Sequence, residues 1–156
     1  MGKNRILDAF YNTICLTIIT ILLSSCSLPR IIVFHDPLTP EEHVNLGVSY
    51  ESKGELDAAL KEYETASKKS QIAYLYMGNI YFQKNDFENA EKYYRKAIKK
   101  TDDPRAYNNL AWLYYTMDTE LQEAEKLARK AVELSPDSVD FEDTLDRIIE
   151  KRGHAR

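Results

Sequence analysis

A pattern of small and aromatic residues occurs three times along this chain, and no other feature constrains the fold as strongly. Each copy places an aromatic or histidine ring, a large apolar residue, a small residue and a tyrosine at helical spacing, and an alanine-rich segment follows. The residues of the three copies are His43, Leu46, Gly47, Tyr50, Ala59, Tyr63 and Ala66; Tyr74, Met77, Gly78, Tyr81, Ala90, Tyr94 and Ala97; and Tyr107, Leu110, Ala111, Tyr114, Ala124, Ala128, Ala131 and Pro136. Copies spaced by roughly 31 to 34 residues predict helix pairs that stack on one another.

The spacing resembles the tetratricopeptide repeat, whose aromatic, Leu-Gly, Tyr, Ala and late Pro positions recur over about 34 residues. The resemblance implies an all-α protein, an α-solenoid of three helix pairs with a C-terminal capping helix. Gly47, Gly78 and Ala111 stand where the two helices of a pair approach most closely, so a large side chain is excluded there. The other motif residues, including Pro136, are expected to fill the space between helices, because one pair cannot cover its own apolar face.

Helix start and stop signals divide the repeat region. The expected segments are repeat 1 over residues 39–70, repeat 2 over 71–103, repeat 3 over 104–137, a capping helix over 138–152 and a frayed tail over 153–156. Thr39, Pro40 and Glu42 form a strong helix start. Asp118 and Thr119 are expected to cap the second helix of the third pair. A single helix with one charged face is typical of the end of such a stack.

The N-terminus has the pattern of a secretory signal, with a basic start and an apolar stretch before a cysteine. Leu23, Ser24, Ser25 and Cys26 resemble the lipobox of bacterial lipoproteins. In that family the cysteine is lipidated and the preceding signal, here 1–25, is removed. Two alternatives remain open, a chance cysteine after an ordinary signal and an uncleaved membrane anchor.

Residues 26–38 are expected to form the lipidated N-terminus and an extended linker, because Pro29 and Pro37 interrupt any helical period. The apolar run 31–34 could dock on the first helix, fold into the groove, lie near the membrane or contact a partner. The resemblance to lipoproteins implies a bacterial envelope location. Ser27, where an Asp would favour inner-membrane retention, indicates the outer membrane facing the periplasm.

Composition and motifs argue against several classes of function. The net charge of −4 argues against nucleic-acid binding. The three histidines, His35, His43 and His154, lie in the linker, the first helix and the tail. The sequence has no phosphate loop, no metal-ligand spacing and no nucleophile signature. We therefore expect no enzyme activity, no cofactor and no metal.

The family resemblance places a binding groove on the first helix of each pair. Carried over to this sequence, the groove positions are Val44, Val48, Glu51, Leu75, Asn79, Phe82, Gln83, Arg105, Asn108, Trp112 and Tyr115. Asn79 and Asn108 each offer a donor and an acceptor that could hold a peptide backbone. Phe82, Trp112 and Tyr115 offer apolar anchors, unless Phe82 and Trp112 instead contact the next repeat or the linker.

One well-known mode of the family holds a peptide carboxylate with Lys, Asn and Arg side chains. Val44 and Val48 stand where that clamp needs Lys and Asn, and Asn109 stands where it needs Arg. The sequence therefore disfavours that mode.

The layout is similar to small repeat lipoproteins that help assemble outer-membrane complexes. It predicts a membrane-tethered, non-catalytic adaptor or assembly factor that binds a protein or peptide partner. A self-associating structural lipoprotein and a regulatory subunit of an envelope enzyme remain as alternatives.

Overall fold

A computed structural model describes residues 11, 13–14, 16–18 and 36–154 of the chain. Contacts divide the chain into two compact units, residues 1–36 and 37–156. Cys26, the signal boundary and the apolar run 31–34 lie outside the described residues. Among the described helices, none is long and apolar enough to cross a membrane.

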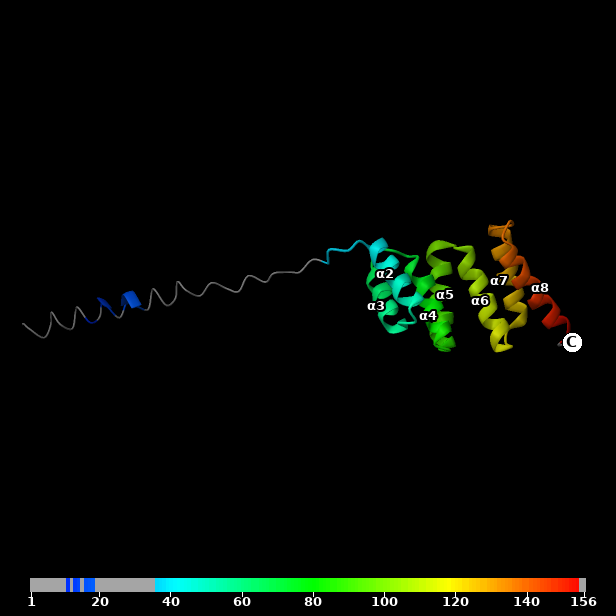
Figure 1. Cartoon of the computed structure of the whole chain (residues 1–156), viewed down its shortest axis with the longest axis horizontal. Coiled ribbons are helices and arrows are strands. Elements are labelled where there is room, and N and C mark those ends of the chain that lie inside the picture. The colour runs from blue at the N-terminus through cyan, green and yellow to red at the C-terminus, as the bar shows by residue number, and fades with distance from the viewer. Residues whose placement is uncertain (1–10, 12, 15, 19–35, 155–156) are drawn as a thin grey trace, which may run out of the picture. The chain divides into compact units, whose positions relative to one another are not determined.

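The unit of residues 37–156 is a stack of seven helices joined by short turns (Figure 1). In chain order they are α2 (Pro40–Ser52), α3 (Leu56–Ala66), α4 (Ala73–Gln83), α5 (Phe87–Thr101), α6 (Pro104–Met117), α7 (Leu121–Leu134) and α8 (Val139–His154). The strongest contacts join α2 to α3, α4 to α5 and α6 to α7, and α8 packs on both α6 and α7. The structure confirms the all-α fold with three helix pairs and a final single helix.

Local sequence signals explain where α2, α5 and α6 begin. Thr39 and Glu42 form a reciprocal capping box at α2: the Thr39 backbone N–H donates to Glu42 Oε2 at 2.7 Å, and the Glu42 backbone N–H donates to Thr39 Oγ1 at 3.2 Å. Asp86 caps α5 by accepting from the Asn89 backbone N–H. Asp103 and Pro104 start α6 in the same manner.

Glycine and tyrosine form a matched pair in the first two repeats. A Cβ added at Gly78 would lie 2.5 Å from Cδ1 and Cε1 of Tyr94, and one added at Gly47 would lie 2.7 Å from Cδ1 of Tyr63. Each tyrosine ring thus occupies the space that a side chain would need. The third repeat has alanine at both corresponding positions, 111 and 128, and both alanines are fully buried.

The buried side chains form two clusters along the stack. One includes Val44, Tyr63, Met77 and Ile80 between the first pairs. The other includes Leu75, Tyr94, Leu110 and Ile148, and so extends from α4 to α8. Most predicted packing residues are buried or half-buried, but Pro136 is exposed in the turn before α8. The prediction that Pro136 packs between helices was wrong, because the turn carries its ring out to solvent.

Two expectations about helix ends also differ from the structure. Asp118 does not cap α7; it ends α6 in the left-handed conformation with φ 54°, and Glu120 stands at the start of α7 with φ 47° and no side-chain cap. The helix α8 continues through Gly153 to His154, so the tail is not frayed from residue 153. Lys151, Arg152 and His154 in its last turn favour this continuation, because cations stabilise a helix C-terminus.

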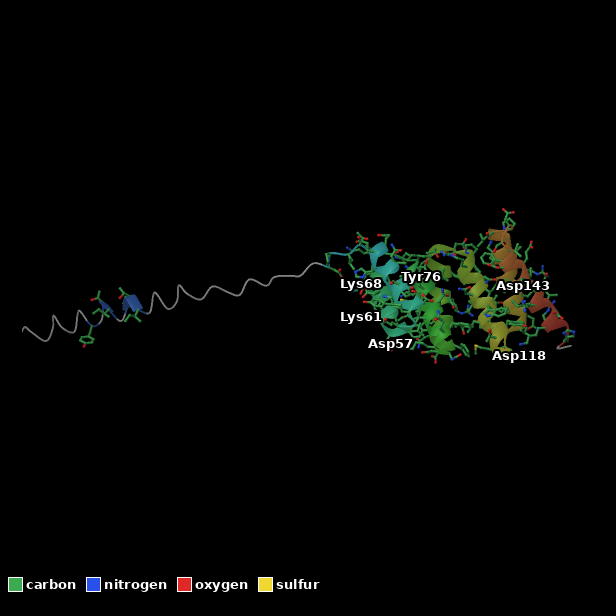
Figure 2. All side chains as sticks on the ribbon, in the orientation of Figure 1. Asp57, Lys61, Lys68, Tyr76, Asp118 and Asp143 are labelled. Atoms are coloured by element: carbon green, nitrogen blue, oxygen red, sulfur yellow. The ribbon has the colours of Figure 1, made fainter. Side chains whose placement is uncertain are left out.

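Charged side chains cover the outside of the stack. Figure 2 labels Asp57, Lys61, Lys68, Asp118 and Asp143, all of which are exposed. Several pair with neighbours, as Arg147 does with Asp143 at 2.6 Å. Such exposed pairs contribute little stability, about 0–1 kcal/mol each, so buried packing holds the repeats together.

Candidate functional site

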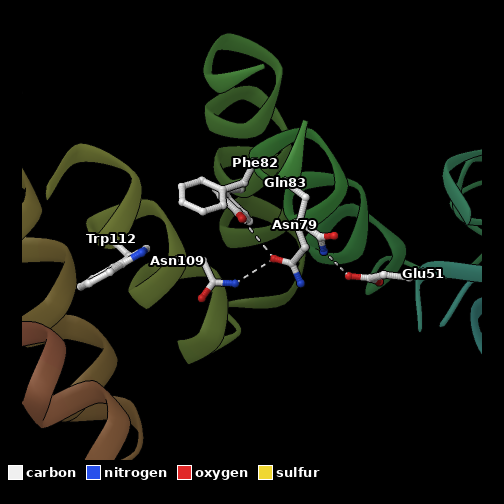
Figure 3. Close-up of a pocket in the computed structure, with 7 residues that line it drawn as sticks. Glu51, Asn79, Phe82, Gln83, Asn109 and Trp112 are labelled. Carbon is white, nitrogen blue, oxygen red and sulfur yellow. Dashed lines mark hydrogen bonds between the residues drawn. The ribbon is translucent and has the colours of Figure 1, made fainter. Parts of the chain in front are cut away.

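A pocket of about 250 Å³ opens beside the first helices of the three pairs (Figure 3). We call it the central pocket. It is lined by residues from α2, α4, α5 and α6, namely Glu51, Asn79, Phe82, Gln83, Tyr94, Asn109 and Trp112. Three separate repeats contribute to it, so the stacking of the repeats builds the site.

Asn79 is the centre of the hydrogen-bond network in the central pocket. Its Oδ1 accepts from the Tyr94 hydroxyl at 3.1 Å and from Asn109 Nδ2 at 2.9 Å (Figure 3). Two donors on Oδ1 fix the orientation of the Asn79 amide. No described residue accepts from Asn79 Nδ2 or donates to Asn109 Oδ1. The asparagine pair therefore leaves the Asn79 Nδ2 group as a donor and Asn109 Oδ1 as an acceptor for a ligand.

Glu51 supplies the charge at one end of the pocket. Its Oε2 accepts from the Tyr63 hydroxyl at 2.8 Å, and its Oε1 accepts from Gln83 Nε2 at 2.5 Å. Both partners are neutral, so they orient the carboxylate and leave its charge in place. Among the described residues, no Lys, Arg or His forms an ion pair with Glu51.

Aromatic side chains supply the apolar part of the pocket. Phe82 packs against Phe87 with ring centroids 5.7 Å apart. Trp112 stacks on Tyr115 at 4.9 Å, and Lys151 Nζ of α8 lies 4.7 Å from the centroid of the Tyr115 ring. The Lys151 amine also donates to the Tyr115 carbonyl at 2.9 Å. The capping helix thereby holds the helix turn that carries Trp112.

Burial raises the pKa of Tyr94 well above its ordinary value of 10.0, and the nearby charge of Glu51 raises it further. The phenol therefore stays protonated and remains a hydrogen-bond donor to Asn79. Tyr63 behaves in the same way, because burial and its hydrogen bond to Glu51 both raise its pKa.

The structure brings together only part of the predicted groove. Glu51, Asn79, Phe82, Gln83 and Trp112 all line the central pocket. Val48 is 42% exposed on α2 but does not line the pocket.

Several predicted groove residues lie elsewhere. Leu75 is 2% exposed and Val44 is 8% exposed, and both belong to the buried clusters. Arg105 lies at the start of α6 and pairs with Asp103 at 2.6 Å. Tyr115 contacts Trp112 from outside the pocket lining. The burial of Leu75 and Val44 corrects the carried-over set, because an apolar side chain at the edge of the groove packs into the core. Arg105 and Tyr115 lie outside the pocket lining.

The second asparagine of the pocket is Asn109, not Asn108. Asn108 does not line the pocket, and its Oδ1 is buried with no hydrogen-bond partner among the described residues. Tyr94, predicted only as a packing residue, forms part of the pocket lining. The sequence did contain a reason to place Asn109 in the pocket. Asn109 stands where tetratricopeptide repeats that hold a peptide carboxylate have a ligand-binding Arg.

The lining groups of the central pocket are suited to hydrogen bonding and to apolar contact. Among the described residues there is no group of three or more His, Cys, Asp or Glu side chains that could hold a metal ion. The lining offers amides, a carboxylate, a protonated phenol and two large apolar rings. These groups fit an extended peptide, whose backbone needs one donor and one acceptor for each residue.

Sequence comparisons identify the repeats. Two family models described as tetratricopeptide repeat match residues 43–68 and 75–139. The mitochondrial import receptor subunit TOM70 of Saccharomyces cerevisiae is 34% identical over 88 residues, 55% of this chain and 14% of that protein. Tetratricopeptide repeat protein 6 of Homo sapiens is 39% identical over 64 residues, 39% of this chain and 12% of that protein. The chain thus spans only a small part of these relatives.

Solved structures share the fold. The first repeat domain of Spaghetti (RPAP3) bound to an HSP90 peptide has a TM-score of 0.68 at 19% identity, over 78% of this chain and 98% of that one. The Sgt2 repeat domain of Aspergillus fumigatus has a TM-score of 0.68 at 16% identity, over 74% and 80%. A repeat protein of Parabacteroides merdae has a TM-score of 0.65 at 22% identity, over 76% and 48%.

Proposed function

We propose that this chain, which belongs to the tetratricopeptide repeat family, is a non-catalytic interaction module whose central pocket binds an extended peptide segment of a protein partner. The observation that carries the proposal is the pair of amides at Asn79 and Asn109. Their mutual hydrogen bond leaves Asn79 Nδ2 as a donor and Asn109 Oδ1 as an acceptor for a ligand in the pocket. A peptide unit supplies the complementary acceptor and donor.

The apolar walls support the same conclusion. Phe82 and Trp112 are large rings on two different helices that line one cavity. Aromatic side chains in such settings supply much of the binding energy at interfaces. A peptide would therefore be held along its backbone by the amides and through a side chain by the rings.

The type of peptide differs from that of one similar structure. The Spaghetti (RPAP3) domain is bound to the HSP90 peptide SRMEEVD, whose last four residues include two Glu and a final Asp. The central pocket of this chain has Glu51 and no Lys, Arg or His in its lining. We propose that this module does not take an acidic tail of that kind.

Peptide selection with a matched control tests the pocket. A library of capped peptides would be selected on the wild type, and the binders measured on Asn79→Ala/Asn109→Ala and on Asn108→Ala. The double variant should lose at least about tenfold in affinity. The Asn108→Ala control should bind nearly as the wild type does, because Asn108 does not line the pocket. Equal loss in both variants, or loss in neither, would place the site elsewhere.

We further propose that the module works tethered to the bacterial envelope through a lipid on Cys26, at the outer membrane facing the periplasm, as an adaptor or assembly factor. The support is the sequence pattern around Cys26, which lies outside the described residues. Replacing Cys26 with Ser should abolish lipid labelling and processing. Unchanged labelling would refute the tether, and processing without labelling would indicate an ordinary signal.

Measurement of mass across a range of protein concentrations separates an adaptor from a self-associating structural protein. The adaptor proposal predicts a monomer at every concentration. A dimer that the Asn79→Ala/Asn109→Ala variant cannot form would instead assign the pocket to self-association.

A further inference from the structure

We infer that the central pocket selects peptides carrying a Lys or Arg side chain next to an apolar side chain, with the cation on Glu51 and the apolar group between Phe82 and Trp112. This inference rests on the proposed peptide-binding function and names the chemistry of the peptide. It follows from the distribution of charge and apolar surface in the pocket.

Glu51 is the charged residue of the lining. Its carboxylate is half-buried and is held in place by the Tyr63 hydroxyl and by Gln83 Nε2. Each of these neutral donors occupies one carboxylate oxygen, and each oxygen can accept further hydrogen bonds. The carboxylate is therefore oriented before a ligand arrives, and it retains the capacity to bind a cationic side chain.

Four basic residues near the pocket lining in sequence already have other contacts. Arg95, next to Tyr94 on α5, pairs with Glu91 at 2.8 Å. Lys84, next to Gln83 on α4, pairs with Asp57 of α3 at 2.5 Å. Lys53, at the end of α2, lies 5.8 Å from the centroid of the Tyr50 ring. On α6 the guanidinium of Arg105 binds Asp103. No ion pair of the described residues neutralises Glu51, so a ligand would have to supply the positive charge.

The negative charge of Glu51 also acts on Tyr94, which lines the pocket. It contributes to raising the pKa of Tyr94, after the larger effect of burial. A carboxylate bound beside Asn79 would meet the same unfavourable field, and a cation would meet a favourable one. Electrostatic complementarity of this kind determines specificity more than total affinity.

The aromatic rings define the second requirement. Figure 3 shows Trp112 and Glu51 on opposite sides of the asparagine pair, with Phe82 between them on the upper wall. A peptide whose backbone lies on Asn79 and Asn109 would place neighbouring side chains towards these two ends. One end requires an apolar group and the other a cation.

The test uses three pools of peptides that are acetylated and amidated, so that they carry no terminal charge. The pools are identical mixtures of apolar and neutral residues around one central position, which is Lys, Gln or Glu. The full chain is purified in a mild detergent, and binding is read from labelled-peptide anisotropy and from the fluorescence of Trp112, the single tryptophan of the chain.

The Lys pool should bind the wild type at least about tenfold more tightly than the Glu pool, and added salt should reduce the difference. Glu51→Gln keeps an acceptor for the Tyr63 hydroxyl. Its affinities for the Lys pool and the Glu pool should differ by no more than about twofold. Glu64→Gln is the matched control, since this exposed glutamate of α3 lies outside the pocket lining. It should leave the preference for Lys unchanged.

The outcomes separate this inference from the proposed function. Failure of all three pools to bind would overturn both. Binding without a preference for Lys, or a preference that survives Glu51→Gln, would overturn the charge selection while leaving peptide binding in place. Loss of the preference for Lys in Glu51→Gln and not in Glu64→Gln would establish that Glu51 selects a cationic side chain.

Discussion

Replacement of Gly78 by Ala tests how the repeats are held together. The new Cβ would lie 2.5 Å from Cδ1 and Cε1 of Tyr94, whereas carbon atoms in contact prefer about 3.5–4 Å. The Tyr94 ring would therefore have to move by roughly 1 Å. It has little freedom to do so, because it is 2% exposed and its hydroxyl binds Asn79.

The expected cost is the difference between two effects. Overpacking of a buried site lowers the unfolding free energy by about 1–3 kcal/mol. The higher helix propensity of alanine raises it by up to about 1 kcal/mol. The net loss of unfolding free energy should be about 1–2 kcal/mol. Urea unfolding of residues 37–156, the compact unit that contains helices α2 to α8, measures this loss.

Two further variants separate the clash with Tyr94 from other effects of an added methyl group. In a Tyr94→Ala background the clash is absent, so Gly78→Ala should stabilise by up to about 1 kcal/mol, giving the alanine pair found at 111 and 128 of the third repeat. Gly153→Ala on α8 should be neutral or slightly stabilising, since a Cβ there meets nothing within 4 Å. Equal effects of Gly78→Ala with and without the Tyr94 ring would refute the close-packing argument.

Three other predictions concern turns and titration. Glu120→Gly should stabilise by about 1 kcal/mol in urea unfolding, because Glu120 has φ 47° without a side-chain cap; a loss of stability would contradict this. The hydrogen bond from the Thr39 backbone N–H to Glu42 lowers the pKa of Glu42 below its ordinary 4.5, so its stabilisation is present above pH 4.5 and lost as the pH falls through the lowered pKa. In Glu42→Gln the unfolding free energy should therefore fall less steeply as the pH is lowered. An unchanged pH dependence would exclude a contribution of Glu42 to stability. Burial raises the pKa of Tyr94 above 10.0, so its contribution is fully present below pH 10.0 and declines as the pH rises further. Tyr94→Phe should reduce the alkaline loss of stability, and an identical alkaline limb would show that the phenol ionises freely in the folded state.

The helical fold was predictable because its signals are local and repeated. The capping box at Thr39 and Glu42 acts within one helix, and the small residues at Gly47, Gly78 and Ala111 each act between the two helices of a pair. The small residue recurs in all three copies, and this recurrence specifies the pairing. The end of α8 was harder to predict, since Gly153 resembles a stop signal while the basic last turn favours continuation.

The site was predictable only in part, because its details depend on helix rotation. Successive helix residues point about 100° apart, and Asn108 and Asn109 have the same side chain. The sequence alone therefore did not decide which of them faces Asn79. Leu75 has a related ambiguity, since its position borders both groove and core. Its apolar side chain packs into the core, where burial stabilises it.

NMR of the side-chain resonances reports whether the amides of Asn79 and Asn109 bind a peptide beside Trp112. Residues 37–156 would be titrated with a peptide selected from the Lys pool, and the N–H signals of the two amides and of the Trp112 indole followed. We expect these signals to shift together with one affinity, while exposed signals of α3 and α7 stay fixed. Shifts confined to α3, α7 or the outer face of α8, with the Asn79, Asn109 and Trp112 signals unchanged, would contradict this expectation.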